Sequence, residues 1–308
     1  MYKIIDTHCD TASVLLDSNE SLCENNRMVN IPAMKKYKSY IQFFAAWISK
    51  GSQNPKQRAV EILDKAKEEI KKNNINLILN SDDLVKTVEN NSLGGVLAIE
   101  DARALCGSLS AVRFFYDYGV RAITLAWNDD NEVTAGVANE EKSAGLTDFG
   151  KEVVGEMNRL GMIVDVSHIT EKGFWDVLSV SKKPVMASHS NCYSVCNHRR
   201  NLKDEQIKAL IANGGIMGIN IYPPFLENAP EKANIQSVIH HVDHALSLGA
   251  YDNICLGSDF DGIDTTPADI TDASCYIKII DAMKEKYSDE LIDKITHKNF
   301  IEFYKKCL

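Results

Sequence analysis

The stretch Lys3-Ile4-Ile5-Asp6-Thr7-His8-Cys9-Asp10 decides the fold class of this chain. Residues 3–6 are predicted to be the first strand, because the run is short, apolar and β-branched. A doubly wound open sheet usually follows its first strand with a glycine-rich turn that binds phosphate. His8-Cys9-Asp10 stands in that place here, and this difference favours a closed barrel over an open sheet.

The rest of the chain repeats an alternation of strand and helix patterns. Near-continuous apolar strands alternating with helices are typical of a parallel sheet. Eight alternations predict an α/β fold, a (β/α)8 TIM-type barrel, with the doubly wound sheet as the alternative. The predicted strands are residues 3–6, 40–48, 95–99, 121–125, 163–166, 184–187, 215–219 and 253–256, and the predicted helices are residues 55–73, 107–118, 147–160, 170–179, 203–212 and 235–248.

Composition and net charge limit the possible domain organisation and the possible partners of this chain. Hydrophobic residues make up 44% and charged residues 25% of the 308 residues, as in an ordinary soluble globular protein. No Pro/Ser-rich linker divides the chain, so residues 1–308 are predicted to form a single domain, with residues 274–308 as closing helices. The net charge of −9 disfavours a nucleic-acid or anionic-membrane partner.

The sequence predicts a cytoplasmic protein. Met1-Tyr2-Lys3 runs directly into the first strand, without the apolar segment and small-residue cleavage site of a signal peptide. No apolar run approaches the roughly 18 residues of a membrane-spanning helix. The eight cysteines are scattered along the chain, and without an export signal free thiols are expected rather than four disulfides.

Polar side chains recur where the predicted strands end. In a parallel barrel the carboxyl ends of all strands meet on one face, where active sites are built. The strand period of two sends His8 and Asp10 to the same side, with Cys9 pointing away. Each residue alone has a structural explanation, such as capping or a solvated turn, but their joint placement favours one functional centre. The residues are His8, Asp10, Glu100, His168, His189 and Asp259.

Five of these side chains form a candidate set of metal ligands. Three imidazoles and two carboxylates suit zinc or a similar ion better than magnesium or calcium. Five ligands exceed the need of one catalytic zinc, so a bridging Glu100 is expected to divide them between two ions. His8 and Asp10 would complete one site, and His168 and His189 the other. Two such ions would share a water and lower its pKa, so that hydroxide is available near neutral pH.

Four segments resemble the membrane (renal) dipeptidase family, a branch of the amidohydrolase-like metal-dependent barrels. They occur in the family's order and span nearly the whole chain. Residues 184–201, PVMASHSNCYSVCNHRRN, are a long and highly specific match, and the other three segments are moderately specific. These three are Asp6-Thr7-His8-Cys9-Asp10, Asp165-Val166-Ser167-His168 and Gly257-Ser258-Asp259-Phe260-Asp261-Gly262.

The resemblance implies a metallo-dipeptidase, a hydrolase that cleaves small dipeptides with a free C-terminal carboxylate by means of a metal-bridging hydroxide. It implies the same five metal ligands. Arg200 would bind the substrate carboxylate through a bidentate contact, with Tyr222 lining the same pocket. Asp259 would take a proton from the bridging water and pass it to the leaving amine.

Two positions depart from the family's pattern. Trp127 stands where well-studied members have a histidine that polarises the scissile carbonyl, and an indole N–H is a poorer, differently placed donor. Asp101 stands where the family usually has glycine after the bridging glutamate, and it is expected to add charge beside the metals. Both departures bear on substrate choice and rate more than on the metal site.

Other functions stay open on the residues alone. A metal-dependent barrel hydrolase acting on a lactam, cyclic amide or phosphoester would use the same ligands, although Arg200 suits a linear substrate with a free carboxylate. A non-catalytic, metal-retaining binding protein is the other alternative, favoured by Trp127 and opposed by Asp259. A homodimer is compatible with the sequence, which does not decide the oligomeric state.

A further group of histidines lies in the predicted helix at residues 235–248. His240 and His244 are spaced as in a zinc metalloprotease helix, but His241 occupies the position of the required glutamate. The segment is therefore interpreted as an exposed helix face.

Overall fold

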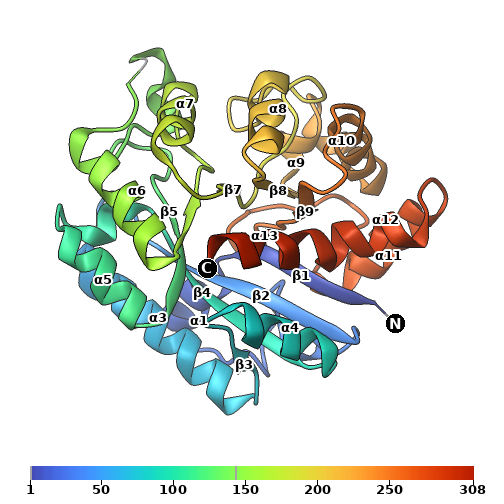
Figure 1. Cartoon of the computed structure of the whole chain (residues 1–308). Helices are drawn as coiled ribbons and strands as arrows, with labels where there is room; N and C mark the ends of the chain where they lie inside the picture. Colours follow the sequence, from blue (N-terminus) through green and yellow to red (C-terminus); the bar gives the residue numbers. More distant parts are fainter. Residues whose placement is uncertain (1, 143) are drawn as a thin grey trace.

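The fold is a closed barrel of parallel strands surrounded by helices, as the sequence predicts (Figure 1). A computed structural model describes residues 2–142 and 144–308. Eight strands form the described barrel in the order β2-β1-β9-β8-β7-β6-β5-β4, and pairing between β2 and β4 closes the ring. They are β1 (Lys3–Cys9), β2 (Ser39–Trp47), β4 (Leu93–Glu100), β5 (Val120–Thr124), β6 (Ile163–Asp165), β7 (Met186–Ala187), β8 (Ile216–Ile219) and β9 (Ile254–Leu256).

The short strand β3 (Asn76–Leu77) is not among the predicted strands. It pairs with Gly94 and Gly95 at the start of β4, before Leu97, where β5 begins to pair with β4. Two residues are too few to show a strand's alternation of apolar and polar side chains. Periodicity therefore carried no signal for β3.

The outer layer consists of helices whose apolar faces pack on the strands. In α3, the residues Ala59, Ile62, Leu63, Ala66 and Ile70 are buried and recur at the helical spacing that predicted this element. All six helices predicted from such spacing form, with bounds within two residues of the prediction. The helices are α1 (Thr11–Ser18), α2 (Ile31–Met34), α3 (Pro55–Lys72), α4 (Ser81–Glu89), α5 (Leu109–Asp117), α6 (Asp148–Leu160), α7 (Glu171–Val180), α8 (Asp204–Ala212), α9 (Pro223–Leu226), α10 (Ile235–Ser247), α11 (Tyr276–Lys284), α12 (Asp289–Asp293) and α13 (Asn299–Cys307).

The amino-terminal mouth of the barrel is sealed by apolar side chains. Ile5, Phe43 and Ile163 point inward and form one buried cluster with residues of α13. Phe300 of α13 packs edge-on against Phe43 at a ring-centroid distance of 5.2 Å. The helix, red in Figure 1, lies across this mouth. The polar residues predicted to form the functional centre lie at the opposite mouth, at the carboxyl ends of the strands.

All eight cysteines are free thiols, as predicted. Six are buried, and Cys23 and Cys106 are exposed. Among the described residues, no helix is both long and apolar enough to cross a membrane.

Candidate metal centre

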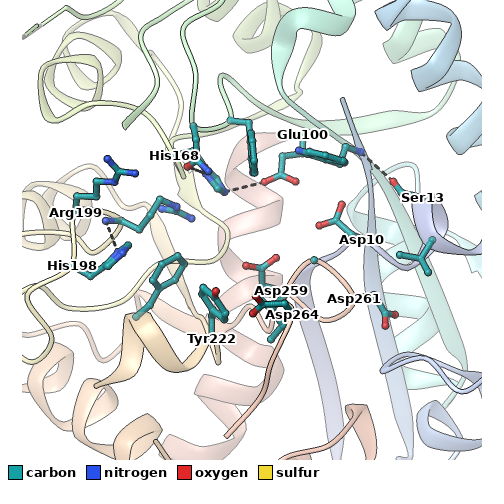
Figure 2. Close-up of a pocket in the computed structure, with 18 of the residues that line it drawn as sticks. Asp10, Ser13, Glu100, His168, His198, Arg199, Tyr222, Asp259, Asp261 and Asp264 are labelled. Atoms are coloured by element: carbon teal, nitrogen blue, oxygen red, sulfur yellow. Dashed lines mark hydrogen bonds and ion pairs between the residues drawn. The ribbon is translucent and has the colours of Figure 1, made fainter. Parts of the chain in front are cut away.

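The five side chains predicted as metal ligands converge at the carboxyl-terminal mouth of the barrel, where Figure 2 shows Asp10, Glu100 and His168. His8 Nε2 is 3.6 Å from Asp10 Oδ2 and 3.5 Å from Glu100 Oε2. His168 Nε2 and His189 Nε2 are 3.0 and 3.6 Å from the other oxygen, Glu100 Oε1. Oε2 of Glu100 thus faces His8, which in turn lies next to Asp10, and Oε1 faces His168 and His189, an arrangement that suits a bridging carboxylate.

A bulge in β1 turns His8 toward the barrel interior. Between Asp6 and Cys9, β1 advances three residues while its partner β2 advances two. Ile5, before the bulge, belongs to the interior cluster, whereas Cys9 belongs to the outer one. Residues four apart on a regular strand share a face, so the extra residue has reversed the alternation. His8 and Asp10 therefore point inward together; without the bulge His8 would face the outer helices.

The imidazole nitrogens are arranged for cations rather than for bonds to one another. His168 Nε2 and His189 Nε2 lie 2.7 Å apart. The other nitrogen of His168, Nδ1, donates to Asn128 Oδ1 at 3.0 Å, which leaves a lone pair on Nε2. His8 Nε2 and Asp10 Oδ1 are buried without a hydrogen-bond partner. Buried lone pairs without a donor are costly, and divalent ions on the two sides of the bridging carboxylate would satisfy them.

Asp165 orients His189 through Ser188. The Ser188 hydroxyl donates to Asp165 Oδ2 at 2.5 Å, and Ser188 Oγ is 2.7 Å from His189 Nδ1. Because the hydroxyl gives its one hydrogen to the carboxylate, Oγ must accept from Nδ1–H. Nε2 of His189 is thereby unprotonated, as a metal-binding imidazole requires.

Asp6 makes the same set of contacts beside Asp259. Its carboxylate accepts hydrogen bonds from the Ser258 hydroxyl at 2.6 Å and the Ser258 backbone N–H at 3.0 Å. Asp165 likewise accepts from the backbone N–H of Ser188 at 3.0 Å. Each aspartate ties its strand to the serine that precedes a site residue on the neighbouring strand. The two carboxylates therefore fix the positions of His189 and Asp259.

Burial and charge set the protonation of the centre. Burial lowers the pKa of His168 and of His189 well below the usual value, so both rings stay neutral. Burial acts in the same direction on His8, but the Glu100 and Asp10 carboxylates outweigh it and raise its pKa. Burial, with the charge of Asp10, raises the pKa of Glu100 to about 8. Cations bound here would favour neutral imidazoles and ionised carboxylates alike.

Asp259 lies beside the centre as a group able to exchange a proton. Its Oδ1 is 3.9 Å from His8 Nε2, and its Oδ2 accepts a hydrogen bond from Asn220 Nδ2 at 3.0 Å. Burial, opposed by His8 and reinforced by the charge of Asp10, raises the pKa of Asp259 to about 6. Its φ of +67° is a costly conformation for a non-glycine residue, of the kind that clusters at functional sites.

Gly262 lies against the carboxylates of Asp10 and Asp259, and a Cβ at this position would overlap both. Gly262→Ala is therefore expected to displace them, weakening metal binding roughly 10–100-fold and lowering kcat by about an order of magnitude or more. Metal titration and steady-state kinetics measure the two effects. Gly155→Ala is the control, because an added Cβ there meets nothing within 4 Å. Equal losses in both variants would contradict this explanation.

A pocket of about 530 Å³ opens beside the metal ligands, and Glu100, His168 and Asp259 form part of its wall. In Figure 2, His198 and Arg199 lie at one end of this pocket and Asp10 lies toward the other. Arg199 therefore brings a positive charge to one end of the pocket and Asp10 a carboxylate toward the other, while burial lowers the pKa of His198 to about 4, so that its ring is neutral.

Arg200, which also lines this pocket, is a buried cation. The residue is 5% exposed, its Nη2 donates to the His189 backbone carbonyl at 3.1 Å, and its Nε has no hydrogen-bond partner. Within the described residues, its guanidinium takes part in no ion pair. Burial lowers the pKa of Arg200 to about 10, so the group is charged at neutral pH. A buried charge is costly unless paired, which makes Arg200 a candidate for binding an anionic ligand group.

Several known proteins are similar to this chain. The sequence profile of the membrane dipeptidase family, peptidase family M19, matches residues 1–307. The chain belongs to this family. It is 30% identical over 342 aligned residues to an uncharacterised dipeptidase of Schizosaccharomyces pombe, covering 99% of this chain and 80% of the relative. It is 35% identical to dipeptidase tcpJ of Claviceps purpurea over 73% of this chain, although only 54% of that relative is covered.

Solved structures share the fold of this membrane dipeptidase family member. A metallopeptidase from Rhodobacter sphaeroides, liganded with a phosphinate mimic of L-Ala-D-Ala, superposes with a TM-score of 0.89 at 24% identity, over 100% of this chain and 99% of that one. The M19 metallopeptidase dipeptidase AC superposes with a TM-score of 0.92 at 24% identity, over 99% and 98% of the two chains. The predicted family, the (β/α)8 barrel and the class of metal-dependent dipeptidase are thus confirmed. The chain spans about half the length of some curated relatives, 48% of a second Schizosaccharomyces pombe dipeptidase and 54% of tcpJ.

Asp101, where the membrane dipeptidase family usually has glycine, adds a buried carboxylate directly after Glu100, and this carboxylate is paired with Arg103. The φ of Asp101, +81°, explains why glycine suits the position. Its carboxylate accepts hydrogen bonds from the Arg103 guanidinium at 3.2 Å and from Asn131 Nδ2 at 2.6 Å. The Arg103 cation balances the charge of Asp101, and these bonds hold the residue in its unusual conformation.

Trp127, which replaces the family's histidine, lines the pocket. Its ring packs edge-on against Trp47 at 5.3 Å and lies 6.1 Å from the His168 ring. Two asparagines are not among the predicted site residues: the adjacent Asn128, which orients His168, and Asn220, which holds Asp259. Both asparagines follow a barrel strand, β5 and β8, so their place beyond the strand ends was the available signal.

The interpretation of the α10 histidine segment as an exposed face is wrong for His241. This residue is fully buried, and its ring bonds the backbone N–H of Cys192 and the carbonyl of Leu226, both at 3.1 Å. His244 pairs with Asp204 at 2.8 Å. Among the described residues, no cluster with metal-binding geometry contains either histidine.

Proposed function

We propose that this chain hydrolyses small dipeptides that carry a free C-terminal carboxylate, using two divalent ions. The proposal is carried by the position of Glu100, whose Oε2 faces His8 and whose Oε1 faces His168 and His189. Three imidazoles and two carboxylates favour zinc. The ligands are His8, Asp10 and Glu100 for one ion, and Glu100, His168 and His189 for the other.

Asp259 is proposed to move the proton. Divalent ions at this centre would polarise the scissile carbonyl and activate a water near neutral pH. Asp259 accepts the proton that this water loses and returns it to the leaving amine, a role supported by its burial and its pKa of about 6. Asn220 occupies Oδ2, so we assign proton transfer to Oδ1, the oxygen nearer to His8.

Arg200, Tyr222 and Trp127 are proposed to position the substrate. The Arg200 guanidinium is 5.4 Å from the centroid of the Phe225 ring, and the Tyr222 ring packs edge-on on the same phenylalanine at 4.9 Å. This shared neighbour supports a carboxylate pocket formed by both residues. Arg200 lines the same pocket as Glu100 and His168, so a substrate bound there by its C-terminal carboxylate would extend toward the metal ligands. Trp127 forms the wall next to His168.

Arg200→Met is expected to lower kcat/KM for a free dipeptide by roughly two orders of magnitude, because a charge-assisted contact is lost. The corresponding dipeptide amide, which has no carboxylate, should be affected far less. Steady-state kinetics on both substrates measures the difference. Arg159→Met is the control, because that arginine is exposed and paired with Glu156 on the surface.

The same kinetic comparison distinguishes the rival functions. If the wild type prefers amides or lactams, and if Arg200→Met leaves kcat/KM unchanged, the protein is a barrel hydrolase of other specificity. A metal-loaded wild type inert on every substrate would point to a binding protein that retains its metals.

We further propose that residues 1–308 act as one domain in the cytoplasm. α13 shares a buried cluster with the barrel strands, which supports a single cooperative unit. The eight free cysteines support a reducing compartment.

A further inference from the structure

A second cavity of about 200 Å³ adjoins the pocket at Arg200. His168, Arg199 and Arg200 line both cavities, so the two meet beside the metal ligands. A water occupies about 30 Å³ of liquid. The second cavity therefore has room for several waters or for one amino-acid side chain.

Three residues in the wall of this cavity carry unsatisfied polar atoms. Ser190 Oγ, Arg200 Nε and Asn201 Oδ1 are buried and have no hydrogen-bond partner. The three residues are 1%, 5% and 5% exposed. Folded proteins rarely leave buried polar atoms unpaired. Their concentration around one cavity indicates that it receives polar contents, either ordered water or a ligand group.

The charges of the cavity wall favour an anion. Both of its carboxylates are engaged: Glu171 pairs with Lys203 at 2.7 Å, and Glu140 accepts the Glu171 backbone N–H at 3.0 Å. Arg199 is exposed and, within residues 2–142 and 144–308, forms no ion pair. A cation without a partner therefore stands where the two cavities meet.

We propose that the second cavity binds the side chain of the substrate's C-terminal residue and selects the carboxylates of aspartate and glutamate. The inference rests on the proposed function, because Arg200 must first hold the α-carboxylate of that residue. Its side chain then starts next to Arg200, at the junction of the cavities. Arg199 supplies the matching charge, and the Ser190 hydroxyl supplies a hydrogen-bond donor.

The test compares kcat/KM for Ala-Glu, Ala-Gln and Ala-Leu on zinc-loaded protein. Wild type should prefer Ala-Glu to Ala-Leu by about tenfold or more, the scale of one charge-assisted hydrogen bond, with Ala-Gln between them. Arg199→Met should bring the ratio close to one, Arg199→Lys should retain part of it, and Ser190→Ala should reduce it. Higher ionic strength should also reduce it. Lys208→Met removes the same charge from an exposed position on α8 outside the cavity wall and should leave the ratio unchanged.

Two outcomes would overturn the subsite and leave the dipeptidase proposal standing. One is equal kcat/KM for Ala-Glu and Ala-Leu in wild type, as expected if the cavity holds water only. The other is an equal decrease of kcat/KM for Ala-Glu and Ala-Leu in Arg199→Met, because Arg199 would then not distinguish between the two side chains. Hydrolysis of none of the three dipeptides by metal-loaded protein would overturn both proposals.

Discussion

Glu100→Gln is expected to empty both metal sites, so that the metal content falls from about two ions per chain toward none. The side chain keeps its size but loses the charge and one of the two oxygens that face the other predicted ligands. Activity should fall by at least about three orders of magnitude, because the bound ions would supply the activated water. His8→Ala, which removes a ligand from one side only, should leave about one ion. Elemental analysis of dialysed protein and dipeptide kinetics measure these effects.

Glu69→Gln is the matched control for the loss of a buried carboxylate. Glu69 is 3% exposed and accepts the backbone N–H of Leu22 at 2.8 Å, away from the barrel mouth. This variant should keep two ions per chain. Fully loaded wild type with one ion or none would refute the two-metal proposal outright.

Asp259→Asn is expected to lower kcat by roughly two or more orders of magnitude while both ions stay bound. The amide oxygen can still accept the hydrogen bond from Asn220, so the local geometry is kept. The amide cannot take up and return a proton. Parallel measurements of kcat and of metal content separate the loss of proton transfer from the loss of a ligand.

Asp261→Asn is the control for this change. Asp261 also has a positive φ, +64°, and is two residues away, but its carboxylate accepts from the Thr11 hydroxyl and the Met28 backbone N–H. Its substitution should lower kcat much less. Unchanged turnover in Asp259→Asn would remove Asp259 from the mechanism, and loss of an ion would make it a ligand.

The sequence determined the barrel and the candidate ligands, because both leave local patterns. A helix such as α3 buries one face, and this produces apolar residues at helical spacing. A barrel strand is apolar along its length and ends on a shared face, so His168 and His189 could be assigned to one centre before any coordinates. β3 could not be predicted in this way, because a strand of two residues is too short to show a periodic pattern.

The tertiary structure decided how the side chains of the candidate metal ligands are oriented. The bulge in β1 arises from its register with β2, and without it His8 would face the outer helices. Asn128 orients His168 across 40 residues of sequence, and Asp165 reaches Ser188, beside His189, across 23. The periodicity of a sequence indicates which face of its own helix or strand a side chain occupies. It does not indicate which atoms of other elements contact that side chain, because these contacts depend on packing between segments far apart in the chain. The burial of His241 is an example.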